Sequence, residues 1–139
     1  MSRPIFHLAF PVPSLAAAKR FYVDQLGASV GRENPSWIDI WFYGHQLTIH
    51  EKPNQVLPQE ILGVRHFGIV MDWQAWESLA DRLGKNQVDF LSPPQKKHQG
   101  TPQEQAKFHL RDPGQNVLEF KAYRNPQTAL GTQSSAPDG

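Results

Sequence analysis

Apolar and polar residues divide the chain into two successive series of predicted strands and helices. In the first series, the apolar run at residues 5–12 predicts a strand, which Pro11 and Pro13 bring to an end. Ser14 can cap a helix whose apolar positions recur at helical spacing until Gly27. Strand-like stretches follow at residues 29–32, 37–43 and 46–52. The first series is therefore strand, helix, strand, strand, strand.

A polar connector at residues 53–63 separates this series from a second one. Residues 65–71 predict a strand, and Asp72 can cap a helix that Gly84 closes. Further strands are predicted at residues 88–91, 107–111 and 117–123. The segment Asp-Pro-Gly-Gln-Asn at residues 112–116 is a strong turn signal, so the last two strands are predicted to form a hairpin.

Two segments are too polar to pack into a core. Residues 92–105 are rich in Pro, Gln, Lys and Gly, which predicts a mobile loop near a site or an extended connector. Beyond Arg124 the composition predicts a disordered tail over residues 125–139. The predicted domain is residues 1–124, with modules at 5–52 and 64–124.

The two series share residues as well as their order of elements. His7-Leu-Ala-Phe followed by Asp24-Gln-Leu-Gly is answered by His66-Phe-Gly-Ile followed by Asp81-Arg-Leu-Gly. The histidines are 59 residues apart and the aspartates 57, a difference that a change in loop length explains. We therefore predict a duplicated βαβββ module and an α+β fold.

Length, composition and charge limit the partners and the metal ligands that the chain can have. The 139 residues fit one domain, or two very small ones on a shared core, and the net charge of +1 without long basic runs does not favour nucleic acid as a partner. No signal segment or membrane-spanning run is evident, so we expect a cytoplasmic protein without a membrane partner. The absence of cysteine leaves His and carboxylate side chains as metal ligands.

Three residues inside predicted strands suit a metal site: His7, His66 and Glu119. If the modules fold alike, their first strands bring the two histidines to one cleft, and the last strand supplies the glutamate. This ligand set suits Fe(II) best, and Mn(II), Ni(II), Zn(II) or Co(II) also fit. Taken singly, a strand histidine is usually a hydrogen-bonded core or surface residue, and such a glutamate usually faces solvent. Their placement in the repeat favours the metal site.

Neighbouring polar residues are candidates for catalysis and substrate binding. Thr48 shares a strand face with Gln46 and His50, so His50 can act as a general acid or base, or can be a hydrogen-bonded residue at a strand edge. Tyr123 shares a face with Glu119 and can orient a substrate oxygen or simply pack. The remaining histidines are predicted to be solvated rather than catalytic: His45, His98 and His109.

The aromatic residues allow two interpretations. Trp37, Trp41 and Phe42 can form a wall for a planar substrate, or belong to the core. Trp73 and Trp76 are predicted to cover the outer core.

Four motifs carry a resemblance to a known family: Ile5-Phe-His-Leu-Ala-Phe, Phe21-Tyr-Val-Asp-Gln-Leu-Gly27, Arg65-His-Phe-Gly-Ile-Val70 and Phe108-His-Leu-Arg-Asp-Pro-Gly-Gln-Asn-Val-Leu-Glu119. In these motifs the chain resembles the vicinal oxygen chelate superfamily of glyoxalases, extradiol dioxygenases, fosfomycin-resistance enzymes and bleomycin-binding proteins. The resemblance covers nearly all of residues 5–123. It is specific for the superfamily and much less so for a reaction.

The resemblance implies two βαβββ modules that form an open, incomplete barrel around one divalent ion, in a homodimer. Three family ligand positions match His7, His66 and Glu119. The fourth, where glyoxalases place a carboxylate or amide, falls on Thr48, whose hydroxyl is a poor ligand. The remaining set resembles that of the extradiol dioxygenases, which use two histidines and one glutamate.

The sequence thus predicts a metal-dependent enzyme that binds two neighbouring oxygens of a small organic substrate. Dioxygenase chemistry is favoured over glyoxalase-like lyase or isomerase chemistry because only three protein ligands are evident. Gln46, Thr48 and Trp41 are expected to contact the substrate. The alternatives are a non-catalytic drug-binding protein and a regulatory or subunit-interface protein that keeps only the fold.

Overall fold

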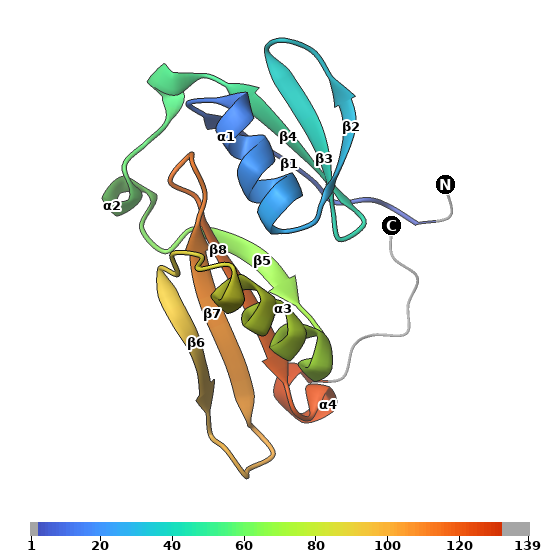
Figure 1. The fold of residues 1–139 in the computed structure, drawn as a ribbon. Coiled ribbons are helices and arrows are strands. Elements are labelled where there is room, and N and C mark those ends of the chain that lie inside the picture. Colours follow the sequence, from blue (N-terminus) through green and yellow to red (C-terminus); the bar gives the residue numbers. More distant parts are fainter. Residues whose placement is uncertain (1–2, 132–139) are drawn as a thin grey trace. The chain divides into compact units, whose positions relative to one another are not determined.

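The structure is a computed structural model that describes residues 3–131. Their contacts divide the chain into two units, each built on one sheet (Figure 1). Unit 1 comprises the chain up to Arg65 together with the turn at residues 112–116. Unit 2 comprises residues 66–111 and 117–131 of the described chain.

Unit 1 contains a four-stranded mixed sheet with one long helical segment. Its elements are β1 (His7–Val12), α1 (Leu15–Lys19), a π-helical continuation (Arg20–Gln25), β2 (Ser29–Glu33), β3 (Trp37–Phe42), β4 (His45–Glu51), a short 3₁₀ turn (Pro53–Gln55) and α2 (Gln59–Leu62). The sheet order is β1-β4-β3-β2, with β1 parallel to β4 and the other pairs antiparallel.

The helix of unit 1 begins and ends where the sequence predicts. Ser14 caps it, because its Oγ accepts a hydrogen bond of 3.2 Å from the amide of Ala17. It ends before Gly27, which has a φ of +80°, a conformation that glycine adopts without strain. Its buried residues face the apolar side of the sheet, and together they form the core of unit 1: Phe10, Val12, Ala18, Tyr22, Leu26, Ile38, Ile40, Leu47 and Ile49.

A buried polar contact joins this core to the turn at residues 112–116. The hydroxyl of Tyr22 donates a hydrogen bond of 2.6 Å to Oδ2 of Asp112. Oδ1 of Asp112 accepts from the amides of Gly114 and Asn116, each at 2.8 Å, which closes the predicted turn. Burial raises the pKa of Asp112, although these hydrogen bonds oppose the change.

Unit 2 repeats the topology of unit 1. Its elements are β5 (His66–Val70), α3 (Trp73–Lys85), β6 (Ser92–Lys97), β7 (Gln105–Arg111), β8 (Val117–Tyr123) and α4 (Pro126–Leu130). The sheet order is β5-β8-β7-β6, with β5 parallel to β8. Both sheets are open and each carries helices, so the predicted α+β fold of two βαβββ modules is confirmed.

Helix α3 buries an apolar face against the second sheet. Trp73 and Trp76 are both buried, as predicted, and Nε1 of Trp76 donates 2.8 Å to the carbonyl of Phe120. Phe108 and Phe120 stack at 5.2 Å between ring centroids beneath the helix. The two aromatic pairs anchor α3 to β7 and β8.

The second strand of unit 2 lies four residues later than predicted. Residues 88–91 form no strand, and β6 covers residues 92–97 of the segment predicted as a loop at 92–105. This strand pairs with β7 alone, so Pro93 and Pro94 remove no ladder hydrogen bond to a second neighbour. Lys96 supplies charge at this edge through an ion pair of 3.0 Å with Glu77.

The predicted disordered tail begins at residue 125. Its residues Pro126–Leu130 form the short helix α4, and residues 132–139 lie outside the described part of the chain. Proline is favoured at the first position of a helix, which suits Pro126.

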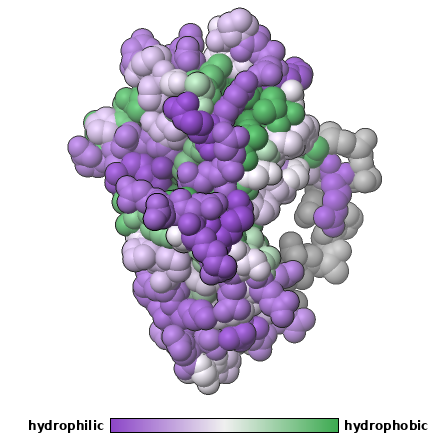
Figure 2. Space-filling view, in the orientation of Figure 1, coloured by the Kyte–Doolittle hydropathy of each residue, from purple (hydrophilic) through white to green (hydrophobic). Residues whose placement is uncertain are grey.

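The surface is mainly hydrophilic in the view of Figure 2, with hydrophobic residues exposed in separate patches. The most exposed large apolar side chains are Phe6, Ile61 and Val64. None of the helices within residues 3–131 has the length and apolar character that crossing a membrane requires.

Candidate functional site

The sheet face of unit 1 opposite its core carries the residues predicted to act in function. His7, Gln46, Trp41 and Ser29 are register neighbours across all four strands and form one transverse row. The predicted ligand His7 and the predicted substrate contacts Gln46 and Trp41 therefore share one face of this sheet.

Gln46 fixes the ring of His7. Nδ1 of His7 lies 2.9 Å from Oε1 of Gln46. An amide oxygen only accepts hydrogen bonds, so Nδ1 donates in this contact, and Nε2 is the ring nitrogen left for a metal. A ligand histidine is commonly oriented in this way by a partner on its other nitrogen. Gln46 is thus engaged with His7.

Thr48 is engaged with a buried carboxylate. Its hydroxyl donates 2.7 Å to Asp39, and Nε of Arg32 donates 2.7 Å to the other oxygen of the same carboxylate. Asp39 is 2% exposed. Burial by itself would raise its pKa, but the hydrogen bonds from Thr48 and Arg32 and the charge of Arg32 lower it on balance.

His50 lies in the next row of the same face. It is half-buried and stands opposite Pro11 on β1 and Trp37 on β3. Its predicted part in proton transfer stays a prediction.

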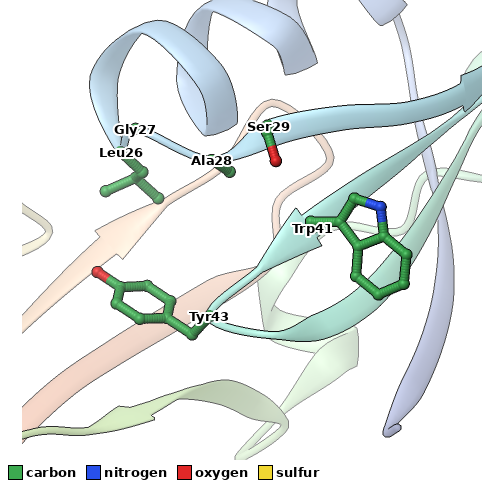
Figure 3. A pocket seen from close by; sticks show the side chains of 6 residues that line it. All are labelled: Leu26, Gly27, Ala28, Ser29, Trp41 and Tyr43. Atoms are coloured by element: carbon green, nitrogen blue, oxygen red, sulfur yellow. The ribbon is translucent and has the colours of Figure 1, made fainter. Parts of the chain in front are cut away.

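A pocket of about 270 Å³ lies at one end of this face, and Figure 3 shows its lining. Its walls come from the end of the helix, the start of β2 and the end of β3: Leu26, Gly27, Ala28, Ser29, Trp41 and Tyr43. Trp41 and Tyr43 are 38% and 44% exposed, whereas Phe42 between them belongs to the core. Of the predicted aromatic wall, Trp41 is thus available to a ligand and Phe42 is not.

In unit 2, His66 and Glu119 lie on the same face of the sheet. Gly68, two residues after His66, stands directly opposite Glu119 in the pairing of β5 with β8. A Cβ atom on Gly68 would collide with the backbone of Glu119, so glycine permits this close pairing. The two predicted ligands are therefore held on adjacent strands.

His109 contacts Glu119 directly, so the prediction of a solvated His109 is wrong. Its Nε2 lies 2.7 Å from Oε2 of Glu119, and the two side chains are 17% and 14% exposed. The ring of His66 approaches His109 edge-on, with 6.3 Å between centroids. A signal for this pair was present, because the turn at 112–116 sets Arg111 opposite Val117, and hence His109 opposite Glu119.

The charges around Glu119 favour its ionised form. Burial would raise its pKa, but the hydrogen bond from His109 and the charges of His109, Lys121 and His66 lower it on balance. Nζ of Lys121 lies 3.6 Å from Oε1. A hydrogen bond with Tyr123 is the largest cause that raises the pKa of Lys121. Tyr123 is thus engaged with Lys121, and its predicted role toward substrate stays a prediction.

The donor set fits a divalent ion of the predicted kind. Two imidazoles, one with its Nδ1 already bonded, and an ionised carboxylate are suitable ligands for Fe(II) and its neighbours. In neither unit do three His, Asp or Glu side chains within residues 3–131 form a group that could hold a metal ion. Ligation by His7, His66 and Glu119 would draw on both units and stays a prediction.

The sequence matches one protein-family model over residues 5–120, the glyoxalase/bleomycin resistance protein/dioxygenase superfamily. A comparison with curated proteins returned no match.

Several solved structures are also similar to this chain. A glyoxalase/bleomycin resistance protein/dioxygenase from Alicyclobacillus acidocaldarius is 31% identical with a TM-score of 0.75, over 91% of this chain and 96% of that one. The fosfomycin resistance protein FosX from Listeria monocytogenes is 16% identical with a TM-score of 0.66, over 88% and 94%. A lactoylglutathione lyase from Agrobacterium tumefaciens is 17% identical with a TM-score of 0.64, over 86% and 92%. The last two proteins share only their fold with this chain. By its family match and its fold, the chain belongs to the glyoxalase/bleomycin resistance protein/dioxygenase superfamily.

Proposed function

We propose that the protein is a divalent-metal-dependent enzyme that binds two neighbouring oxygens of a small organic substrate, with dioxygenase chemistry as the favoured reaction. The main observation in support is that His66 and an ionised Glu119 share one sheet face, while Gln46 orients His7 at the repeat-equivalent position of the other sheet. The proposed ligands are His7, His66 and Glu119, with Fe(II) favoured and Mn(II), Ni(II), Zn(II) or Co(II) as alternatives.

Dioxygenase chemistry is favoured because three protein ligands are proposed rather than four. Thr48, at the position that would supply the fourth, donates its hydroxyl to Asp39. A set of three leaves coordination positions for substrate. A bound ion would supply Lewis-acid activation of the substrate oxygens and, as Fe(II), the chemistry of dioxygen.

The chain's own residues would handle the substrate and its protons. His50, half-buried on the face that carries His7, would accept a proton from a substrate hydroxyl. Tyr123, on the face of Glu119, would orient a substrate oxygen together with Lys121. Trp41 would provide an apolar contact, since its indole is partly exposed. We also propose a homodimer.

One observation favours a second candidate, non-catalytic binding of an aromatic small molecule. The pocket beside Trp41 and Tyr43 offers two exposed aromatic rings and would hold a planar ligand without metal. The family description includes bleomycin resistance proteins, which gives this candidate a precedent. Lyase chemistry is the corresponding alternative among enzymes, as the lactoylglutathione lyase of similar fold suggests.

A substrate screen separates these functions. Protein loaded anaerobically with Fe(II) is assayed for oxygen uptake with catechols, for conversion of thiol adducts of α-ketoaldehydes, and for thiol addition to epoxides. We expect oxygen uptake with a catechol, and its loss in His66→Ala. Turnover only in the other assays would favour a lyase or transferase. No turnover, with tight binding of an aromatic ligand by metal-free protein, would favour sequestration and contradict the enzymatic proposal.

A further inference from the structure

We infer that His109 is a positioning residue that holds the carboxylate of Glu119 in the orientation in which it binds metal. This inference rests on the proposed function, in which Glu119 is a ligand. It adds a residue that lies on β7, a strand that contributes no proposed ligand.

The contact between His109 and Glu119 is short, shielded and set by the strands. The two residues stand directly opposite each other in the antiparallel pairing of β7 with β8, and Nε2 lies 2.7 Å from Oε2. Both side chains are more than four-fifths buried. A glutamate side chain has high rotamer freedom, so a hydrogen bond of this kind removes disorder that a bound ion would otherwise have to remove.

Lys121 constrains Glu119 less. Its Nζ lies 3.6 Å from Oε1, and its side chain is 32% exposed and also bonded to Tyr123. An ammonium on a flexible stem sets direction less than a planar imidazole does. The hydrogen bond from His109 is therefore the contact that fixes the carboxylate. It engages Oε2 and leaves Oε1 without a bond to the imidazole.

Within residues 3–131, the ring of His109 has no hydrogen-bond partner other than Glu119. An ionised carboxylate only accepts, so Nε2 carries the proton in this contact. Its Nδ1 is buried without a hydrogen-bond partner among residues 3–131. The hydrogen bonding of the ring is thus directed to Glu119 alone, which suits a residue that orients one group.

The equivalent pair in unit 1 lacks this arrangement. Thr48 and Asp39 are also opposite neighbours, but there the carboxylate belongs to β3 and the residue of β4 is the donor. Asp39 takes the place of His109 in the sheet. Only in unit 2 does the last strand present a carboxylate with an imidazole behind it.

Two comparisons test the role of His109. The first measures Co(II) affinity, by titration of metal-free protein followed through the Co(II) absorption spectrum, in wild type, His109→Phe, His109→Ala and His109→Gln. Glutamine keeps an N–H donor near the position of Nε2, whereas phenylalanine and alanine remove it. Lys107→Met changes the same face of β7 without removing a contact to Glu119 and serves as the control. The second compares crystal structures of metal-free wild type and His109→Phe, or His109→Ala if the larger ring does not fold.

We expect Co(II) to bind about 10- to 100-fold more weakly to the variants without a donor, and within about threefold of wild type to His109→Gln and Lys107→Met. Without metal, the carboxylate of Glu119 should turn away from its wild-type position when the donor is lost. Unchanged Co(II) affinity, or an unmoved carboxylate, would overturn the role of His109 while the proposed function stands. A wild-type protein that binds no Co(II) would overturn the proposed function and this role together.

Discussion

Thr48 occupies in the sheet of unit 1 the register position that Glu119 occupies in the sheet of unit 2. Each pairs with the residue two positions after the histidine that begins the first strand of its sheet, Ala9 in one and Gly68 in the other. The repeat thus places a hydroxyl where its copy places a carboxylate. Because the hydroxyl of Thr48 is bonded to Asp39, the first sheet offers one proposed ligand and the second offers two.

This equivalence predicts the effect of exchanging side chains. Thr48→Glu should lower the free energy of unfolding by about 1–3 kcal/mol, because it sets a second carboxylate against the buried Asp39. The double variant Thr48→Glu with Asp39→His copies the pair of unit 2 and should recover most of the loss. Urea unfolding of the two single variants and the double variant gives the coupling. If the double variant lost as much free energy of unfolding as the two single variants together, the pair of unit 1 could not take the arrangement of the pair in unit 2.

Asp39 should make stability depend on acid pH. Its folded-state pKa is lowered from the ordinary value of 3.8, so its contribution is fully present above that value and is lost as pH falls through the folded-state pKa. Asp39→Asn should therefore be less stable than wild type near neutral pH, and the difference should shrink below about pH 4. Urea midpoints between pH 3 and pH 7 measure this. A stability difference between Asp39→Asn and wild type that stays constant over this range would contradict the expectation.

Gly68 should tolerate no side chain. Gly68→Ala would drive a methyl group into the backbone of Glu119, so we expect a loss of at least about 3 kcal/mol or failure to fold. Gly84 is the matched control, since it lies within helix α3 with open space around it. Gly84→Ala should stabilise the protein by about 0.5–1 kcal/mol. Thermal unfolding measures the stability of both variants. A small loss of stability in Gly68→Ala would mean that β5 and β8 pair less closely.

Lys121 should weaken cation binding at Glu119. Its ammonium lies 3.6 Å from Oε1 and repels an incoming dication. Lys121→Met keeps the length of the side chain and removes the charge, so Co(II) should bind roughly threefold to tenfold more tightly at low salt. Lys107→Met removes a charge farther along the same sheet and should have a smaller effect. Weaker Co(II) binding in Lys121→Met would indicate that the lysine orients Glu119 rather than opposing the ion.

The sequence predicted the topology because its signals were local. Turn chemistry at residues 112–116, the capping Ser14 and the repeated histidine starts each correspond to features of the fold. Strand β6 was missed because a segment with two prolines and two lysines has no apolar alternation. Its pairing depends on its place at a sheet edge, which periodicity does not encode.

The side-chain contacts of the site were less accessible to sequence reasoning. His7, His66 and Glu119 could be proposed from the repeat, but the partners that orient two of them depend on strand register. Register places Gln46 beside His7 and His109 beside Glu119. For His109 the hairpin turn contained the needed information, whereas the pairing of β1 with β4 joins strands that are far apart in sequence.

The proposed metal site is tested most directly by the metal content of protein purified anaerobically, measured for wild type and for His7→Ala, His66→Ala and Glu119→Gln. Wild type should contain about one divalent ion per chain, and each variant should lose it while circular dichroism shows that the fold is retained. Wild type without metal, or full occupancy in His66→Ala, would contradict the proposed site.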